Sequence, residues 1–438
     1  MTIGFEGLPD HWRISRLDWV ATVNARIGWK ALTAAEYQPS GYTFLATPNI
    51  KNREIDFTNV NYISEFRYRE SPELQLAEGD VLLTKDGFTI GTVNIVRHLP
   101  HPATVNGSIA VLRPFGIHPG FLHYVIASSV IQELIWSVKD GMDVLHLFQR
   151  DIKKFPIPLP PLEEQRRIAN FLDAETSRID SMRRLRNEQL QLWNMRYQSI
   201  LHSQFVASSA TDEAGQDSTW LGRIPLGWTA PTIGRIARFT MGTTFPHDYQ
   251  GQRQGYYPFI KVGDFQLADE VGNLSTAENW VSRDVAHTLR ARIVPAGSIL
   301  YARVGAALLL NRRRVTTRPS VIDDNVRAIT FAGGVPHYWR ALLSLLDMGQ
   351  LVNPGPVPSI GESQVAAVRV PTPPAATQRE IADRVEQHQR QLNQVTSAIQ
   401  RQVNLLAERR QALITAAVTG QFDVTTASGR NVTDGVTA

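Results

Sequence analysis

Three groups of acidic, histidine and lysine side chains have spacings that could support catalysis or hold a metal. Asp143, Asp151 and Lys153 approach the Asp…Asp-x-Lys pattern of metal-dependent nucleases. The matching place in the second half of the chain, residues 362–364, reads Glu-Ser-Gln and has no lysine. We therefore interpret the pattern as coincidental and keep a single-chain nuclease as an alternative only.

The other two groups are weaker candidates for a catalytic or metal site. His98 and His101 have a proline between them and no carboxylate close by in the sequence, which is typical of surface histidines. Asp323 and Asp324 stand beside a short apolar run, where a solvated turn explains them as well as a metal-binding pair does.

Motifs that would indicate an enzyme are missing from the sequence. It has no Gly-x-x-x-x-Gly-Lys-Ser/Thr phosphate-binding loop, no serine nucleophile elbow and no Asn-Pro-Pro-aromatic motif of amino-methylating enzymes. With no cysteine it also has no thiol nucleophile, disulfide or zinc-thiolate site. The sequence therefore predicts a binding protein without a catalytic site, metal or cofactor of its own.

Composition narrows the class of protein further. The chain has 438 residues, a net charge of +4 and 43% hydrophobic residues, as expected for several globular domains that could bind nucleic acid. No stretch approaches the length of uncharged apolar residues that a membrane span needs, and the first residues do not resemble a secretory signal. We expect a cytoplasmic protein without membrane contact.

The chain contains an internal repeat. Residues 155–169 match residues 368–382, and the match continues without a gap until Ile200, which aligns with Leu413. Leu8–Trp12 is answered by Ile224–Trp228, each an apolar residue, a proline, two residues and a tryptophan. This pattern indicates duplication, and hence two similar halves.

Each copy of the long match predicts a helix. Both lack Gly and Pro for more than forty residues and carry apolar residues mostly three, four or seven positions apart. The stripe positions singled out are Ile168, Leu172, Ile179 and Met182 in the first copy, and Leu392, Val395, Ile399, Leu406 and Leu413 in the second. Rods of roughly 65 Å would pair as an antiparallel coiled coil. The alternative is that each helix packs separately on its own domain.

The segments before the two helices predict α/β (α+β) modules. Short apolar runs at 80–83, 108–112, 298–301 and 326–331 are typical of strands, and 121–138 and 337–346 of helices. The expected boundaries are a first module at 1–158, a first helix at 159–207, a linker at 208–218, a second module at 219–370, a second helix at 371–424 and a disordered tail at 425–438. Residues 51–69 and 266–287 cannot be aligned, so the modules differ in their loops.

These features together resemble the specificity subunits of type I restriction-modification systems. The residues that carry the resemblance are Pro156–Ala169 with Ile179-Asp180, Arg409–Gly420, Leu8–Trp12 and Gly79–Leu83. The order of these motifs is that of the family over nearly the whole chain. The second copy departs at 374–377, where the family usually has an apolar residue and acids.

The resemblance implies a role and partners. The two modules would be target-recognition domains that each read one half of a bipartite site in double-stranded DNA, and the helices would set the spacing between the halves. The stripe residues would pair the helices and help dock two methyltransferase subunits, which modify adenine with S-adenosylmethionine. Restriction subunits, acting as endonuclease and translocase with ATP and Mg, would complete the complex.

Basic side chains at expected loop tips are the candidates for DNA contact, because cations bind phosphates and donate to base edges. They are Lys51, Arg53, Lys85, Lys261, Arg303, Arg312, Arg313 and Arg314. Lys85 and Arg303 follow the same strand in the two copies of the repeat. The competing hypothesis is a structural adaptor that joins protein partners through its helices without reading DNA.

Overall fold

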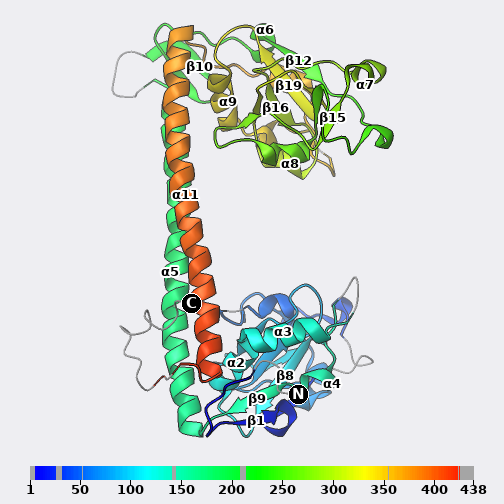
Figure 1. Ribbon diagram of the computed structural model, residues 1–438, viewed down its shortest axis with the longest axis vertical. Coiled ribbons are helices and arrows are strands. Elements are labelled where there is room, and N and C mark those ends of the chain that lie inside the picture. The colour runs from blue at the N-terminus through cyan, green and yellow to red at the C-terminus, as the bar shows by residue number, and fades with distance from the viewer. Residues whose placement is uncertain are drawn as a thin grey trace. The chain divides into compact units, whose positions relative to one another are not determined.

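The chain divides into two compact units, and each unit takes residues from both halves of the sequence. The computed structural model describes residues 5–25, 32–51, 53–140, 145–207, 214–353, 355–422 and 424. Unit 1 comprises Met1–Leu185 with Gln402–Ala438, and unit 2 comprises Arg186–Arg401. The long helices α5 (Leu162–Ser203) and α11 (Ala375–Val418), green and orange-red in Figure 1, each contribute one end to each unit.

Unit 1 contains an α/β module built from short strands. Its described strands form a four-stranded antiparallel sheet in the order β2-β8-β5-β6, a three-stranded sheet in the order β4-β3-β7, and the pair β1-β9. The bounds are β1 Arg13–Arg16, β2 Ala21–Asn24, β3 Tyr42–Leu45, β4 Asn61–Ile63, β5 Val81–Thr84, β6 Val93–Ile95, β7 Ala103–Val105, β8 Ile109–Pro114 and β9 Pro156–Leu159. The helices before α5 are α1 Glu65–Arg69, α2 Pro119–Ala127, α3 Ser129–Val138 and α4 Gln149–Ile152.

Unit 2 contains a module of the same design. A five-stranded sheet has the order β12-β19-β16-β17-β14, and a three-stranded sheet has the order β15-β13-β18. The bounds are β10 Ala214–Thr219, β11 Gly222–Pro225, β12 Ala237–Met241, β13 Tyr257–Ile260, β14 Asn273–Leu274, β15 Asn279–Val281, β16 Ile299–Ala302, β17 Arg314–Thr316, β18 Val321–Ile322 and β19 Val326–Phe331. Its short helices are α6 Ile233–Ile236, α7 Arg283–Thr288, α8 Ala306–Leu309, α9 Pro336–Leu345 and α10 Glu362–Ala366.

Strand pairing confirms the repeat that the sequence predicts. β3 pairs antiparallel with β4 and parallel with β7, and β13 pairs in the same two ways with β15 and β18. In the larger sheets β8 lies between β2 and β5, as β19 lies between β12 and β16. The fold class is therefore two α/β modules with two long helices, as expected.

The helix expected at 121–138 is two helices. The chain leaves α2 and enters α3 at Ser128, whose φ of −66° and ψ of 153° are extended. The Ser128 hydroxyl donates to the carbonyl of Val125 at 2.6 Å and so satisfies a backbone group that the break exposes. The apolar periodicity continues across the break, which is why the sequence pattern did not reveal it.

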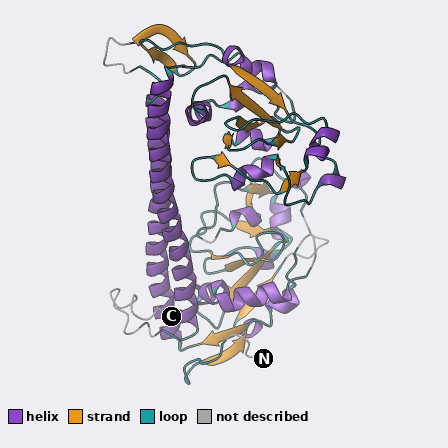
Figure 2. Cartoon of the chain, turned by 45° about the horizontal axis from the view of Figure 1, so that its top comes forward, coloured by secondary structure: helices purple, strands orange, loops and turns teal. Residues whose placement is uncertain are grey.

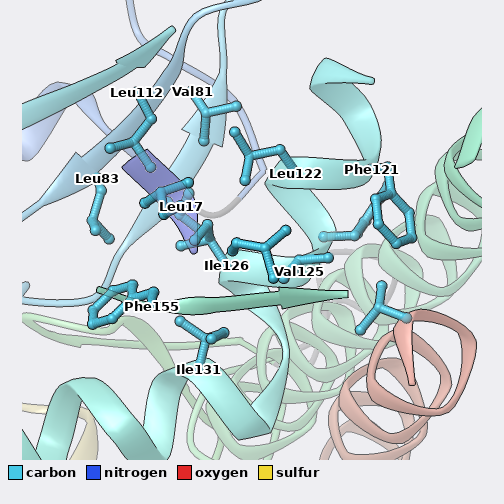
Figure 3. Packing of buried hydrophobic residues seen from close by; sticks show 14 of the residues in the cluster. Leu17, Val81, Leu83, Leu112, Phe121, Leu122, Val125, Ile126, Ile131 and Phe155 are labelled. Carbon is cyan, nitrogen blue, oxygen red and sulfur yellow. The ribbon is translucent and has the colours of Figure 1, made fainter. Parts of the chain in front are cut away.

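The core of unit 1 is closed by both long helices. Its apolar cluster joins the sheet and α2 residues drawn in Figure 3 to the first half of α5 and the last turns of α11. Ile168, Leu172 and Ile179 enter it from α5, and Leu413 and Ile414 enter it from α11. Asp180 contacts Arg410, and Phe171 contacts Phe422, so the two segments run antiparallel.

In the core of unit 2 the two long helices exchange roles, so that the end of α5 and the start of α11 contribute. Leu201 and Phe205, at and just beyond the end of α5, pack in one cluster with Ile381 and Val385 from the start of α11. Tyr338 of α9 completes this contact by packing on Phe205. In both units, then, one helix start and one helix end pack side by side against the module (Figures 1 and 2).

A buried glutamine fixes each module to the start of its helix. Gln165 accepts from the backbone N–H of His118 at 2.8 Å and donates to the carbonyl of Pro160 at 2.8 Å. Its repeat partner Gln378 accepts from Val335 and donates to Pro373 in the same way. Because each amide satisfies backbone groups at two helix entries, the repeated glutamine has a structural role.

Gly420 ends α11 and allows a close approach to the N-terminal motif. Its φ of +69° is left-handed, and a Cβ atom there would lie 2.3 Å from Pro9 Cδ. Trp12, three residues further on, donates to Glu164 of α5 at 3.2 Å. The Leu-Pro-x-x-Trp motif therefore locks the start of one long helix to the end of the other within unit 1.

The linker predicted at 208–218 is in part a β-strand. Residues 214–218 belong to β10, which pairs with β11, and residues 208–213 lie outside the described residues, as does the predicted tail at 425–438. Within the described ranges no single helix is long and apolar enough to cross a membrane, although the bent pair α2 and α3 together reach the required length and hydropathy.

Replacement of Leu172 by alanine should destabilise unit 1. Leu172 is fully buried between α5 and the module, so the truncation removes apolar contact and leaves a cavity, at a cost of about 2–5 kcal/mol. Thermal or denaturant unfolding followed by circular dichroism measures the change. Leu185→Ala is the control, because that side chain is exposed on the same helix. Equal effects of the two substitutions would contradict the packing described.

Candidate nucleic-acid interface

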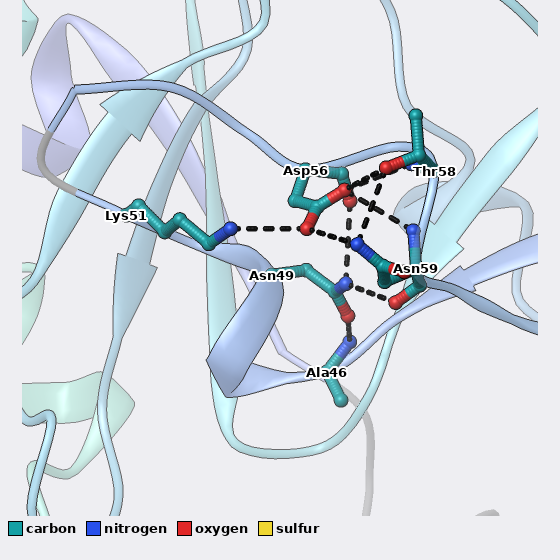
Figure 4. Close-up of polar contacts among 6 residues, drawn as sticks. All are labelled: Ala46, Asn49, Lys51, Asp56, Thr58 and Asn59. Carbon is teal, nitrogen blue, oxygen red and sulfur yellow. Dashed lines mark hydrogen bonds and ion pairs between the residues drawn. The ribbon is translucent and has the colours of Figure 1, made fainter. Parts of the chain in front are cut away.

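A charged loop of unit 1 is held by one carboxylate (Figure 4). Asp56 accepts hydrogen bonds from the backbone and side chains of Thr58 and Asn59 at 2.7–3.1 Å, and from Lys51 Nζ at 3.0 Å. Asn49 donates to the carbonyls of Asp56 and Asn59 and so ties the loop to its base. Hydrogen bonds from Asn59, Thr58 and Lys51 hold the pKa of Asp56 far below its usual range. The loop is thus pre-organised around a permanent negative charge.

The two basic candidates on this loop differ in their freedom. Lys51 is exposed, but its ammonium is bound to Asp56. Arg53 is exposed two residues later and lines a cavity against the long helices. Arg53 is therefore the freer cation.

Lys85 and Arg303 occupy matched loops, as the repeat predicts. The side chain of each has a polar partner within its own unit. Lys85 Nζ lies 2.9 Å from Asp86 Oδ2 and its side chain is largely buried. Arg303 donates through Nε to the carbonyl of Asp324 at 2.9 Å. Contact with DNA would require these side chains to exchange or share their present partners.

The run 312–314 does not form a basic loop tip, which corrects the expectation for two of its members. Only Arg312 is exposed. Arg313 is 3% exposed and donates to Asn311 and to the carbonyl of Leu346, and burial lowers its pKa to about 10. Arg314 begins β17 and donates to the carbonyl of Phe265 at 2.7 Å.

Lys261 is partly buried in unit 2. Its ammonium donates to Gln250 at 2.9 Å and lies 5.1 Å from the centre of the Phe245 ring. Among the candidates of unit 2, Arg312 is therefore the exposed cation, while Lys261, Arg303 and Arg314 each donate to a group within the unit.

Exposed apolar residues on the matched loops were missed from the sequence. Phe88 is 97% exposed, three residues after Lys85, and Leu309 and Leu310 are exposed after Arg303. The Phe88 loop is firmly held, because Gly87 (φ +80°) donates to the carbonyl of Leu145, and Gly91 donates to that of Thr84. The sequence signal for this residue was a phenylalanine in a turn that contains glycines. An aromatic ring exposed on a rigid loop does not stabilise the fold, so its exposure indicates a binding role.

The groups considered for catalysis are not assembled into a site among the described residues. Asp151 lies near Arg150 and Lys154, His98 contacts Glu78, and Asp323 accepts from Asn325 within a turn. Asp143 lies outside the described residues. In the described part of the chain no three His, Cys, Asp or Glu side chains gather as a metal site would require.

The stripe residues of the long helices divide between the two units. Ile168, Leu172, Ile179 and Leu413 are buried in unit 1, and Leu406 packs on that core. Leu392 and Ile399 are buried in unit 2, and Val395 is partly buried there. Met182 is 40% exposed, and Leu185 is exposed beside it. Most stripe residues are therefore buried in the cores that hold the two helices together. Met182 is exposed and remains available for another contact.

Comparison with known proteins gives one family and a matching fold. The model of the type I restriction modification DNA specificity domain matches twice, at residues 9–191 and 225–405. A putative type I restriction enzyme MjaX specificity subunit of Methanocaldococcus jannaschii is 22% identical over 91% of this chain and 93% of its own length.

Two solved structures share the fold. One, from work on complex assembly and conformational transition of the type I R-M system, has a TM-score of 0.71, 20% identity, and covers 95% of this chain and 99% of its own. The other, the HsdS subunit of Thermoanaerobacter tengcongensis, has a TM-score of 0.50, 21% identity, and covers 96% and 100%.

Asp56→Asn should loosen the loop drawn in Figure 4. The amide keeps the size of the carboxylate but loses the charge that four N–H or O–H groups and Lys51 share, so amide exchange at Thr58 and Asn59 should become roughly tenfold faster. Because the pKa of Asp56 is lowered, the wild-type loop should keep this protection at about pH 4 and below, where an ordinary aspartate is already about half protonated.

Hydrogen exchange with mass spectrometry measures this effect. Glu65→Gln is the control, because Glu65 is exposed and pairs with Arg69 on the surface of α1. Unchanged exchange at residues 56–59 in Asp56→Asn would show that the carboxylate does not organise the loop.

Proposed function

The chain belongs to the family of type I restriction modification DNA specificity domains, and from this premise we propose that each of its modules reads one half of a bipartite DNA site. The observation that carries the proposal is the double match of one family model, once over each module, together with shared strand pairing and unlike loops. A shared skeleton with different loops is suited to two targets of different sequence, because base edges are read by side chains placed on such loops.

The long helices would set the spacing between the half-sites. At ~1.5 Å per residue, the 42 residues of α5 span about 63 Å. Half-sites one helical turn apart are separated by about 34 Å along DNA. A continuous helix that contributes to the cores of both units can therefore fix a separation of this size.

Exposed apolar residues on the helices support a docking role. Met182 and Leu185 are exposed on the part of α5 that belongs to unit 1, and Leu192 and Met195 on the part that belongs to unit 2. A row of apolar side chains on a charged helix is suited to a protein partner. We infer that these surfaces bind two methyltransferase subunits.

The chemistry would reside in the partners. S-adenosylmethionine would bind to the methyltransferase subunits, and ATP and Mg to restriction subunits that join the complex. The chain itself would supply recognition and spacing, in the cytoplasm where host DNA is modified.

Half-site spacing offers a direct test of this function. Methylation profiling of the host genome identifies the bipartite site, and the chain with its methyltransferase subunits should then bind that duplex specifically. Insertion of about 5 base pairs between the half-sites rotates one by half a turn and should weaken binding by roughly 100-fold or more. Sequence-independent binding, or no binding to DNA at any salt concentration, would favour the adaptor hypothesis instead.

Phe88→Ala should weaken binding to the specific duplex. A fully exposed aromatic ring on a rigid loop can stack on a base or wedge into a base step, and loss of such a contact costs roughly 5- to 100-fold in affinity. Fluorescence anisotropy with labelled duplex measures the change. Phe115→Ala removes another exposed phenylalanine of unit 1, from the turn after β8, and should bind as wild type does. If both variants retain wild-type affinity, Phe88 has no part in recognition.

A further inference from the structure

A polar cavity of about 310 Å³ lies within unit 1 between the module and both long helices. Arg53 of the charged loop, His123 of α2, Asp173 and Asp180 of α5 and Arg410 of α11 are among the residues that line it. These residues are far apart in the sequence, so the cavity exists only because the end of α11 packs against the first module.

Two nitrogen atoms of this cavity are buried without a hydrogen-bond partner in the described structure. His123 is 4% exposed and its Nδ1 has no partner. Arg410 Nε is likewise buried and lies 3.4 Å from Asp180 Oδ2, longer than a good hydrogen bond. Buried polar atoms are rarely left unpaired, so the cavity is short of an acceptor.

The acidic groups of the cavity are already used. Asp173 accepts from Arg97 at 2.5 Å and from the hydroxyl of Tyr124 at 2.6 Å. Asp180 has Arg183 and Arg410 within 4 Å. A cation would therefore find these carboxylates already paired with arginines, whereas an anion would meet the unpartnered Nδ1 of His123 and the exposed guanidinium of Arg53.

The electrostatic setting favours the same kind of ligand. Burial above all, together with the positive charges of Arg97 and Arg410, lowers the pKa of His123 to about 3. The imidazole is therefore neutral near pH 7 and can donate one N–H from Nδ1. Three arginines against two aspartates leave the lining positive.

Unit 2 shows how the same place is filled elsewhere in the chain. In the repeat, His123 of α2 corresponds to Arg340 of α9, and Arg410 corresponds to Tyr197. Arg340 is buried beside Tyr197 and Glu386. In unit 1 the guanidinium is therefore on the long helix α11, and a shorter histidine occupies the matching position on α2. This exchange of side chains leaves space between the two helices.

We propose that this cavity binds a phosphoryl oxyanion, held by Arg53 at the mouth and by Arg410 Nε and His123 Nδ1 inside. Charge-assisted donors from a planar guanidinium suit the oxygens of such a group. The group could belong to a free phosphate or to the DNA backbone, and only the second source rests on the function proposed above. Either ligand would link the charged loop to α2 and α11, because its oxygens would contact Arg53, His123 and Arg410.

Calorimetric titration of the full chain with inorganic phosphate, in chloride buffer of matched ionic strength, tests the site. Saturable binding at millimolar concentration or below is expected, weakened about tenfold in Arg53→Gln and in His123→Leu. Arg53 is exposed, so its variant should fold even where the His123 variant does not. Arg13→Gln, an exposed arginine of β1 outside the cavity, should bind phosphate as wild type does. Absence of saturable binding, or equal binding by Arg53→Gln and wild type, overturns the proposal.

A second arm separates the two sources of the oxyanion. Duplex DNA binding is measured with and without saturating phosphate at constant ionic strength. Competition by phosphate in wild type that is lost in Arg53→Gln supports a backbone phosphate in the cavity, and DNA binding unaffected by phosphate supports a free ligand. A chain that binds phosphate but no DNA keeps this site and contradicts the function proposed above, and one that binds DNA but no phosphate does the reverse.

Discussion

The structure depends on the burial of one apolar stripe along each of two helices that are too long for a single module to cover. A helix of more than forty residues gains its stability from packing rather than from helix propensity. Each helix buries its first part against the module that precedes it and its last part against the other module. Leu413 and Ile414, near the end of the chain, therefore belong to the core of unit 1, and Leu201 and Phe205 belong to that of unit 2.

The same exchange brings residues at the ends of the long helices into contact with the modules. Gln165 and Gln378 bind the helix entries to α2 and α9, and Gly420 lets the end of α11 approach Pro9. These contacts make the helices part of the modules rather than tethers between them. A residue such as Arg410 can consequently help to shape a cavity in a module from which it is more than 200 residues distant in the sequence.

The charged groups of the modules serve mainly to hold loops in place. Lys51, Lys85 and Arg303 each have a partner within their own unit, and Arg313 is buried. Loops organised in this way lose little conformational entropy when they bind, which favours specific recognition. Among the candidates for DNA contact, Arg53, Arg312 and the ring of Phe88 face solvent.

The sequence predicts the architecture better than the site. The repeat and the apolar periodicity are local signals, so the two helices and strands such as Val326–Phe331 could be predicted within a few residues. The break at Ser128 could not, because a serine is compatible with a helix and the apolar pattern continues past it. The run 312–314 was ambiguous for a similar reason: adjacent side chains at a strand start point to opposite faces, and the sequence does not say which face is covered.

The cavity of unit 1 was beyond prediction from sequence, since Arg53, His123 and Arg410 meet only through tertiary packing. The exposed Phe88 was missed because an aromatic residue in a loop is usually assigned to the core.

Hydrogen exchange of the full chain carrying Leu413→Ala tests most directly whether each module is completed by the helix from the other half. Leu413 follows the second module in the sequence but is buried in the core of unit 1. Faster exchange in β5 and β8 of the first module, with β16 and β19 of the second at the wild-type rate, is the expected result. Faster exchange in β16 and β19, with β5 and β8 unaffected, would show that α11 packs on its own module and would contradict the exchange of helices.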